Sequence, residues 1–149
     1  MKAQAIILTA MIFLLGITTM AQEGSPRTAL LEKESSSPES ITILWSSGDP
    51  DVFENIIWPY FTYSCEQQCW KDMSLFVWGN AVGQLAEKVA WQDKLALLIS
   101  KGLHVKACRY STEQCQATEQ LTSIGVELSY LEEELTRELK GHTTQLLTL

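Results

Sequence analysis

The sequence predicts an α/β domain, a three-layer sandwich built on a mostly parallel five-stranded sheet. Short apolar, β-branched runs alternate with longer segments of helical character between residues 41 and 149. Each helical segment is long enough to return the chain to the start of a parallel neighbour, which places the helices on the faces of the sheet. The 149 residues, of which 46% are hydrophobic, suffice for one domain with a compact core.

The first 40 residues differ in composition from the rest. Residues 1–21 consist of Met1, Lys2, an uncharged apolar stretch and small residues before Gln22, which is typical of a cleaved signal peptide. An uncleaved membrane anchor is the alternative, but the stretch is at the lower limit of the roughly 20 apolar residues that span a bilayer. Residues 22–40 are rich in Glu, Ser and Pro and predict a flexible linker. We therefore expect a periplasmic or secreted protein, free of the membrane after cleavage, with its domain over residues 41–149.

The first strand and helix of that domain have clear signals. Residues 41–45 (Ile-Thr-Ile-Leu-Trp) predict a buried strand. Asp49 and Pro50 predict a helix start, because Asp accepts hydrogen bonds from free backbone N–H groups and Pro suits the first helical position. Pro59 lies inside this helix and should bend or split it near Trp58, since proline removes a hydrogen bond and clashes with the preceding turn.

Residues 73–78 predict the second strand, and Asn80 is the expected cap of the helix that follows. This helix should continue without a break to residue 99 and stop at Lys101 and Gly102.

Residues 103–108 predict the third strand. Ser111 and Gln114 form a capping-box pattern that predicts a helix over residues 112–124, ended by Gly125. The remaining elements expected are a strand, a short helix and a strand, over residues 126–130, 132–140 and 144–149.

A pocket is expected at the carboxyl ends of the first three strands, where parallel α/β sheets place their sites. For the two tryptophans that end strands, a place in the core or in a subunit interface is the alternative. Asp49 is better explained as a helix cap than as a catalytic acid. The candidate pocket residues are Trp45, Gly48, Trp78, Gly79, Asn80 and Arg109.

Several sequence blocks together resemble DsrE-like (DsrE/DsrF-like) sulfur-relay proteins. The blocks are Trp-Ser-Ser-Gly-Asp-Pro at 45–50, Leu-Phe-Val-Trp-Gly at 75–79, Val-Lys-Ala-Cys at 105–108, and Leu-Thr-Arg-Glu-Leu-Lys-Gly at 135–141 with the Leu-Leu-Thr-Leu end. The resemblance implies a small sulfurtransferase-type fold, oligomers often built from trimers, and a persulfide-carrying cysteine after the third strand. Cys108 falls on that position. The chain departs from the family in its export signal and in its next cysteine, Cys115, which lies seven residues on.

Cys108 is the expected catalytic thiol. It precedes a predicted helix start, where backbone N–H groups and the helix dipole favour a thiolate, and Lys106 and Arg109 add positive charge. The alternative is a buried strand cysteine that serves as a small hydrophobic residue.

The other three cysteines have more than one interpretation. Cys115 either resolves an oxidised or persulfidated Cys108 or forms a structural disulfide with it. Cys65 and Cys69 are candidates for a local disulfide. A metal site made of these two with His104 or His142 does not match a zinc pattern, so no metal is expected.

Two functions follow. The first is a thiol-based sulfur carrier or redox protein with a sulfurtransferase-like role, which would exchange sulfur with donor and acceptor proteins and form a trimer or hexamer. The second is a non-catalytic oligomerisation or ligand-binding module with structural disulfides. The chain has 18 acidic and 11 basic residues, so nucleic acid is not an expected partner, and no cofactor motif is present.

Overall fold

The computed structural model describes residues 39–141 and 143–149, and within them a five-stranded sheet. The strand order is β4-β3-β2-β1-β5, and every neighbouring pair is parallel. The predicted α/β class is thus confirmed, with an all-parallel rather than a mostly parallel sheet. The predicted signal peptide and most of the linker lie outside the described residues. The strands are β1 (Ser40–Trp45), β2 (Asp72–Val77), β3 (His104–Cys108), β4 (Glu127–Ser129) and β5 (Thr144–Thr148).

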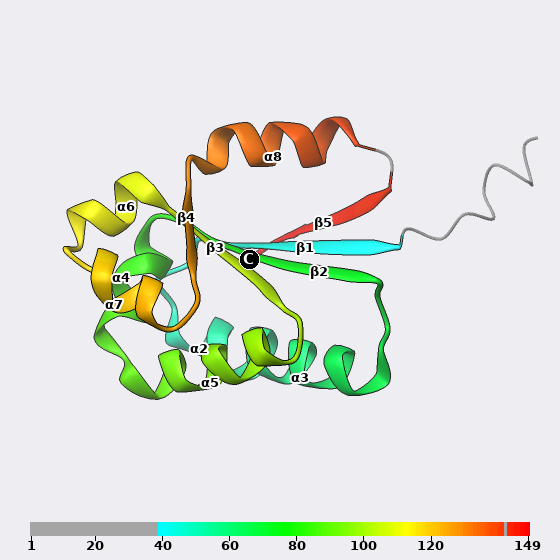
Figure 1. The fold of residues 1–149 in the computed structure, drawn as a ribbon, viewed down its shortest axis with the longest axis horizontal. Helices are drawn as coiled ribbons and strands as arrows, with labels where there is room; N and C mark the ends of the chain where they lie inside the picture. Colours follow the sequence, from blue (N-terminus) through cyan, green and yellow to red (C-terminus); the bar gives the residue numbers. More distant parts are fainter. Residues whose placement is uncertain (1–38, 142) are drawn as a thin grey trace, which may run out of the picture. The chain divides into compact units, whose positions relative to one another are not determined.

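Helices cover the two faces of the sheet unequally (Figure 1). Helix α8 (Leu131–Lys140) lies alone over one face, and the helices between β1 and β3 cover the other. None of the helices in residues 39–141 is long and apolar enough to span a membrane. The remaining helical segments are α2 (Pro50–Val52), η1 (Phe53–Ile57), α3 (Trp58–Gln67), α4 (Asn80–Glu87), α5 (Val89–Ser100), α6 (Arg109–Gln114) and α7 (Thr118–Ser123).

Alternate strand residues divide between a large and a small apolar core. Leu75 and Val77 of β2 belong to the large core under α3 and α5, whereas Phe76 belongs to a small cluster under α8. Trp45 is fully buried in the large core, where its ring lies 5.3 Å from that of Phe53. This division follows from the period-two alternation of strand side chains, and it puts Cys108 of β3 in the small cluster under α8.

The first helical segment begins as predicted and changes register before Pro59. The Asp49 carboxylate accepts a hydrogen bond from the Asp51 backbone N–H at 2.9 Å, and Pro50 takes the first helical position. The chain then makes a π-helical turn, η1, in which the Trp58 N–H donates to the Phe53 carbonyl. In a regular α-helix the Pro59 ring would clash with the carbonyls of the preceding turn. The π turn lies directly before Pro59, where this clash would occur. The chain stays helical from Pro50 to Gln67, so the predicted split near Trp58 does not occur, and the irregularity there is a change of helical register.

The prediction of a single long helix between Asn80 and residue 99 is wrong, because the structure has two helices there, α4 and α5. The chain breaks at Lys88, and the Gln92 side chain donates to the carbonyls of Leu85 and Ala86 at 2.8 and 3.1 Å. Because the buried Gln92 amide satisfies carbonyls that helix continuation would otherwise use, the helix can end there. The expected Asn80 cap is also wrong, since Gly79 occupies the cap position.

The predicted helix over residues 112–124 is likewise two helices. The first, α6, starts directly after Cys108, and the Thr112 hydroxyl donates to the Cys108 carbonyl at 2.9 Å. It ends because Gln116 adopts a left-handed conformation (φ 55°) and the Ala117 N–H returns to the Thr112 carbonyl. The capping box is not formed, because the Ser111 hydroxyl accepts from the Gly79 N–H instead.

Candidate functional site

An open cleft of about 350 Å³ lies at the carboxyl edge of the sheet. Three segments form it: the loop after β1, the turn between β2 and α4 with one side of α4, and the end of α6. This is the edge at which the sequence predicted a pocket. The lining residues are Gly48, Gly79, Asn80, Gly83, Gln84, Glu87 and Cys115.

The turn between β2 and α4 depends on Gly79. Its backbone has φ 58° and ψ −127°, and the Ala81 N–H closes the turn onto the Trp78 carbonyl at 3.3 Å. These angles match the first central position of a type II′ turn, which glycine adopts without steric cost. The Ser111 hydroxyl accepts from the Gly79 N–H at 3.3 Å, and this bond joins the turn to α6.

Two other glycines allow close approach inside the cleft. A β-carbon on Gly48 would lie 3.2 Å from the Asn80 β-carbon, so the loop after β1 packs tightly onto the start of α4. A β-carbon on Gly83 would lie 3.7 Å from the Cys115 Sγ. Cys115 is exposed and is held beside α4 at the last turn of α6.

The sequence predicted part of this cleft and missed part. Gly48, Gly79 and Asn80 line it as expected. Gly83, Gln84 and Glu87 were not identified. The available signal was the three- to four-residue spacing from Asn80 to Glu87, which puts these positions on one side of a helix.

Two predicted pocket residues, Trp45 and Trp78, do not line the cleft. Trp45 is fully buried and packs against Phe53 and Trp91. Trp78 is half-buried and packs against the cluster under α8. The alternative of a core role is therefore correct for Trp45, because the inward side of β1 points away from the edge loops.

Cys108 does not lie in the cleft either. Its side chain is only 1% exposed and packs with Phe76 and Leu131 in the cluster under α8. A thiolate needs access to its reaction partner, and in this arrangement the Cys108 thiol is covered.

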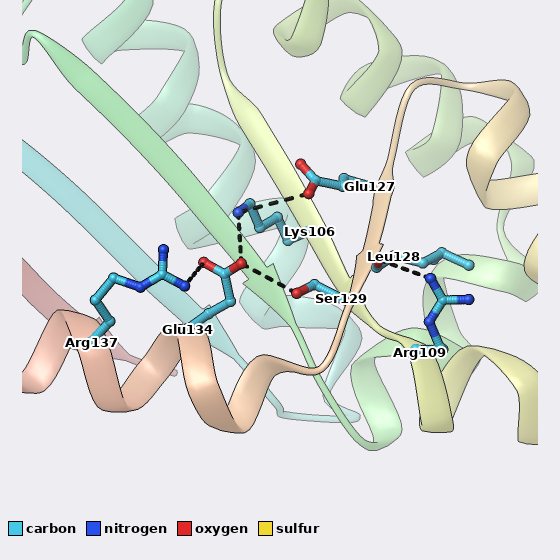
Figure 2. Close-up of polar contacts among 7 residues, drawn as sticks. All are labelled: Lys106, Arg109, Glu127, Leu128, Ser129, Glu134 and Arg137. Carbon is cyan, nitrogen blue, oxygen red and sulfur yellow. Dashed lines mark hydrogen bonds and ion pairs between the residues drawn. The ribbon is translucent and has the colours of Figure 1, made fainter.

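The two cations expected beside Cys108 are engaged elsewhere (Figure 2). The Lys106 ammonium donates to Glu134 of α8 at 3.0 Å. The Arg109 guanidinium reaches the Leu128 carbonyl at 3.4 Å and lies 5.8 Å from the Tyr130 ring, so it points to the β4 side and does not line the cleft. Both cations therefore have partners other than Cys108.

Glu134 connects α8 to the sheet. It accepts from Ser129 at 3.3 Å and lies 3.4 Å from Arg137, in addition to its contact with Lys106. Burial raises the pKa of Glu134, but the hydrogen bond and charge of Lys106 and the charge of Arg137 outweigh it, so the pKa lies below its ordinary value. The carboxylate is therefore a structural anion at neutral pH.

All four cysteines are free thiols, so neither expected disulfide is formed. Cys108 and Cys115 lie at opposite ends of α6, and seven residues at 1.5 Å each separate them by about 10 Å, too far for a disulfide. Cys65 is half-buried, and burial raises the pKa of its thiol. Cys69 is exposed just after the end of α3.

Among residues 39–141 and 143–149, no three histidine, cysteine or acidic side chains are close enough to bind a metal ion. His142 lies outside the described residues. The polar side chains that line the cleft are the amides of Asn80 and Gln84, the carboxylate of Glu87 and the thiol of Cys115. Of these groups, a thiol is the one with nucleophilic chemistry.

No family model and no curated protein matches the chain. Two solved structures are similar to it. The conserved protein of unknown function BT1422 from Bacteroides thetaiotaomicron is 24% identical, with a TM-score of 0.71 over 77% of this chain and 98% of that one. The ychN protein from E. coli is 20% identical, with a TM-score of 0.53 over 76% of this chain and 100% of that one. The chain shares its fold with both. At these identities the likeness concerns the fold alone.

Proposed function

We propose that this protein is an exported thiol-based sulfur carrier or redox protein of the DsrE-like type, and that Cys115 is the thiol that reacts. The observation on which the proposal rests is the position of Cys115, which is exposed at the cleft beside Gly83. The DsrE-like blocks of the sequence and the shared fold support the family part of the proposal. Its site differs from the sequence prediction, which named Cys108.

The geometry supports Cys115 by access and by its surroundings. The thiol lines a cleft with room for a small donor molecule, and the amides of Asn80 and Gln84 line the same cleft. Amides can donate hydrogen bonds to a sulfur anion or to the donor's polar end. Cys108, in contrast, would need movement of α8 before a donor could reach it.

The proposed reaction is sulfur transfer from a persulfide or polysulfide. The Cys115 thiolate attacks the sulfane sulfur of the donor, the new Sγ–S bond forms, and the donor's S–S bond breaks with the electron pair leaving on the donor thiolate. The product is a Cys115 persulfide. An acceptor thiolate would then take the outer sulfur and regenerate the Cys115 thiolate, so the cycle needs no external oxidant or reductant.

The wider setting of this function is also proposed. Cleavage after residue 21 would place the protein in the periplasm or outside the cell, and the DsrE-like resemblance implies a homo-oligomer, a trimer or a hexamer. N-terminal sequencing of the protein recovered from its cells should begin at Gln22. Retention of residues 1–21 would contradict the export part of the proposal.

The test is mass spectrometry of the reduced protein after exposure to inorganic polysulfide. We expect one added sulfur atom at Cys115, a loading rate that saturates with polysulfide concentration, and loss of this saturable step in Cys115→Ser. Cys69→Ser is the matched control, because Cys69 is exposed but lies outside the cleft lining. If Cys115 reacts no differently from Cys69, or if only Cys108→Ser prevents loading, the assignment of Cys115 is wrong.

A cleft that binds a small ligand without using the thiol is the second candidate function. It is favoured by the amides of Asn80 and Gln84 and by Glu87, since these groups make hydrogen bonds irrespective of sulfur chemistry. Slow, non-saturable loading of Cys115 would favour this candidate over the carrier.

A further inference from the structure

The two outer strands of the sheet differ in how well they are protected from pairing with another strand. β4 is three residues long and includes Glu127, and short, charged edge strands resist pairing with a second chain. β5 (Thr-Gln-Leu-Leu-Thr) is five residues long, has no charge, and bonds only to β1 among the described strands. An uncharged, open edge of this kind is a surface for strand addition.

The hydrogen bonds to β1 determine which groups of β5 point outward. The Leu149 N–H donates to the Leu44 carbonyl at 2.8 Å, and the Leu149 carbonyl accepts from the Ser46 N–H at 2.9 Å. Successive residues of a strand direct their backbone N–H and carbonyl groups to opposite sides, so the backbone groups of Leu147 and Gln145 also point toward β1. The N–H and carbonyl groups of residues 144, 146 and 148 therefore face outward.

We propose that β5 pairs in an antiparallel manner with β5 of a second copy of this chain, about a two-fold axis at Leu146. In this register Leu146 of one chain lies opposite Leu146 of the other, and Thr144 of each chain lies opposite Thr148 of the other. Each of the three facing pairs exchanges two hydrogen bonds, about six in all, and the two sheets become one of ten strands. The outward groups of β5 are self-complementary in this register. The inference is independent of the thiol chemistry.

Exposed leucines lie on both sides of the β5 edge. Glu134 reaches β3 and β4 from one side of α8, and Leu139 is five residues on, about 140° around the helix and so on the β5 side. Leu139 is 66% exposed, and Leu147, on the opposite face of the sheet, is 43% exposed. Pairing through β5 would bring both leucines near a second copy and remove apolar surface from water.

The test is the molar mass of the purified protein, measured by light scattering. We expect an even number of subunits, which of the two assemblies proposed above fits the hexamer and not the trimer. We also expect Thr148→Pro to halve the mass, because proline removes an outward N–H without removing a bond to β1. Thr148→Val is the matched control, since it keeps the N–H and should keep the mass. A monomeric wild-type protein, or a mass unchanged by Thr148→Pro, would overturn the proposal.

A second set of variants covers the case in which Thr148→Pro does not fold, as judged by circular dichroism. Leu139→Lys and Leu147→Lys should each weaken association at least several-fold, because each substitution puts a charge where apolar surface would meet the second copy. Variants that fold and associate like the wild type would show that neither leucine lies at the interface and would overturn the pairing.

Discussion

The Sγ of Cys115 lies 3.7 Å from the position that a β-carbon would occupy on Gly83. This distance is an ordinary van der Waals contact, so an alanine fits at position 83 but reduces the space around the thiol. Cys115 and Gly83 come from different helices, α6 and α4, and their approach forms the side of the cleft on which the thiol lies.

Gly83→Ala should stabilise the protein and slow the reaction of Cys115. Glycine inside a helix costs about 0.5–1 kcal/mol relative to alanine, so the free energy of unfolding should rise by that amount in a denaturant titration. Alkylation of Cys115 should become slower, and Gly83→Leu should suppress it further. A Cys115 rate that is insensitive to both substitutions would show that Gly83 does not control access to the thiol.

Gly79→Ala should have the opposite effect on stability. Its φ of 58° with ψ of −127° suits glycine, and an L-residue there should lose about 1–3 kcal/mol of unfolding free energy. Gly83→Ala is the matched control, because it is the same substitution four residues on, at an ordinary helical position inside α4. Equal effects of the two substitutions would contradict the assigned turn.

The four thiols should differ in their reaction with iodoacetamide in the native state. Cys69 and Cys115 are exposed and should react first, and Cys65 should react more slowly because burial raises the pKa of its thiol. Cys108 should react only after denaturation. Peptide mass spectrometry after timed alkylation measures the order, and early labelling of Cys108 would show that α8 opens readily.

Cys108→Ser should destabilise the fold by about 1–3 kcal/mol, because a hydroxyl would replace a thiol in the apolar cluster under α8 and would have to find a hydrogen-bond partner. Cys69→Ser, at an exposed position, should change stability by less than about 0.5 kcal/mol. Thermal unfolding of the two variants provides the comparison. A neutral Cys108→Ser would mean that the hydroxyl finds a partner within the fold.

Glu134→Gln should weaken the attachment of α8 in a pH-dependent manner. The pKa of Glu134 in the folded protein is below its ordinary value of 4.5, so its ionised form stabilises the fold above that pH. The contribution is lost as the pH falls through the folded-state pKa. Near neutral pH the variant should lose about 1–3 kcal/mol, because Lys106 would remain half-buried without its closest carboxylate.

The control for this prediction is Glu133→Gln, the exposed neighbour of Glu134 in α8. Denaturant titrations between pH 3 and 7 should show a wild-type advantage over Glu134→Gln that shrinks on acidification. A difference between the two proteins that does not depend on pH would indicate a packing effect rather than the charge of Glu134.

The sequence by itself determined the features that depend on near neighbours in the chain. The alternation of strands and helices, the Asp49 cap and the presence of an irregularity in the first helix near Pro59 follow from residues a few positions apart. The edge of the sheet that contains the cleft was also predictable, because it depends only on strand direction. Gly48, Gly79 and Asn80 were identified for that reason.

Only the tertiary structure decided which helices break and which thiol is accessible. The Gln92 side chain, which belongs to α5, bonds the last carbonyls of α4 and so allows that helix to end. Helix α6 ends before Gln116, which has a left-handed conformation, although glutamine is not a residue type that predicts a helix end. The end of α6 in turn puts Cys115 at the cleft, while Leu131 of α8 covers Cys108 from 23 positions along the chain. Burial depends on residues that are distant in sequence and close in space, so the pattern around Cys108 could indicate a favoured thiolate but could not show that the thiol is covered.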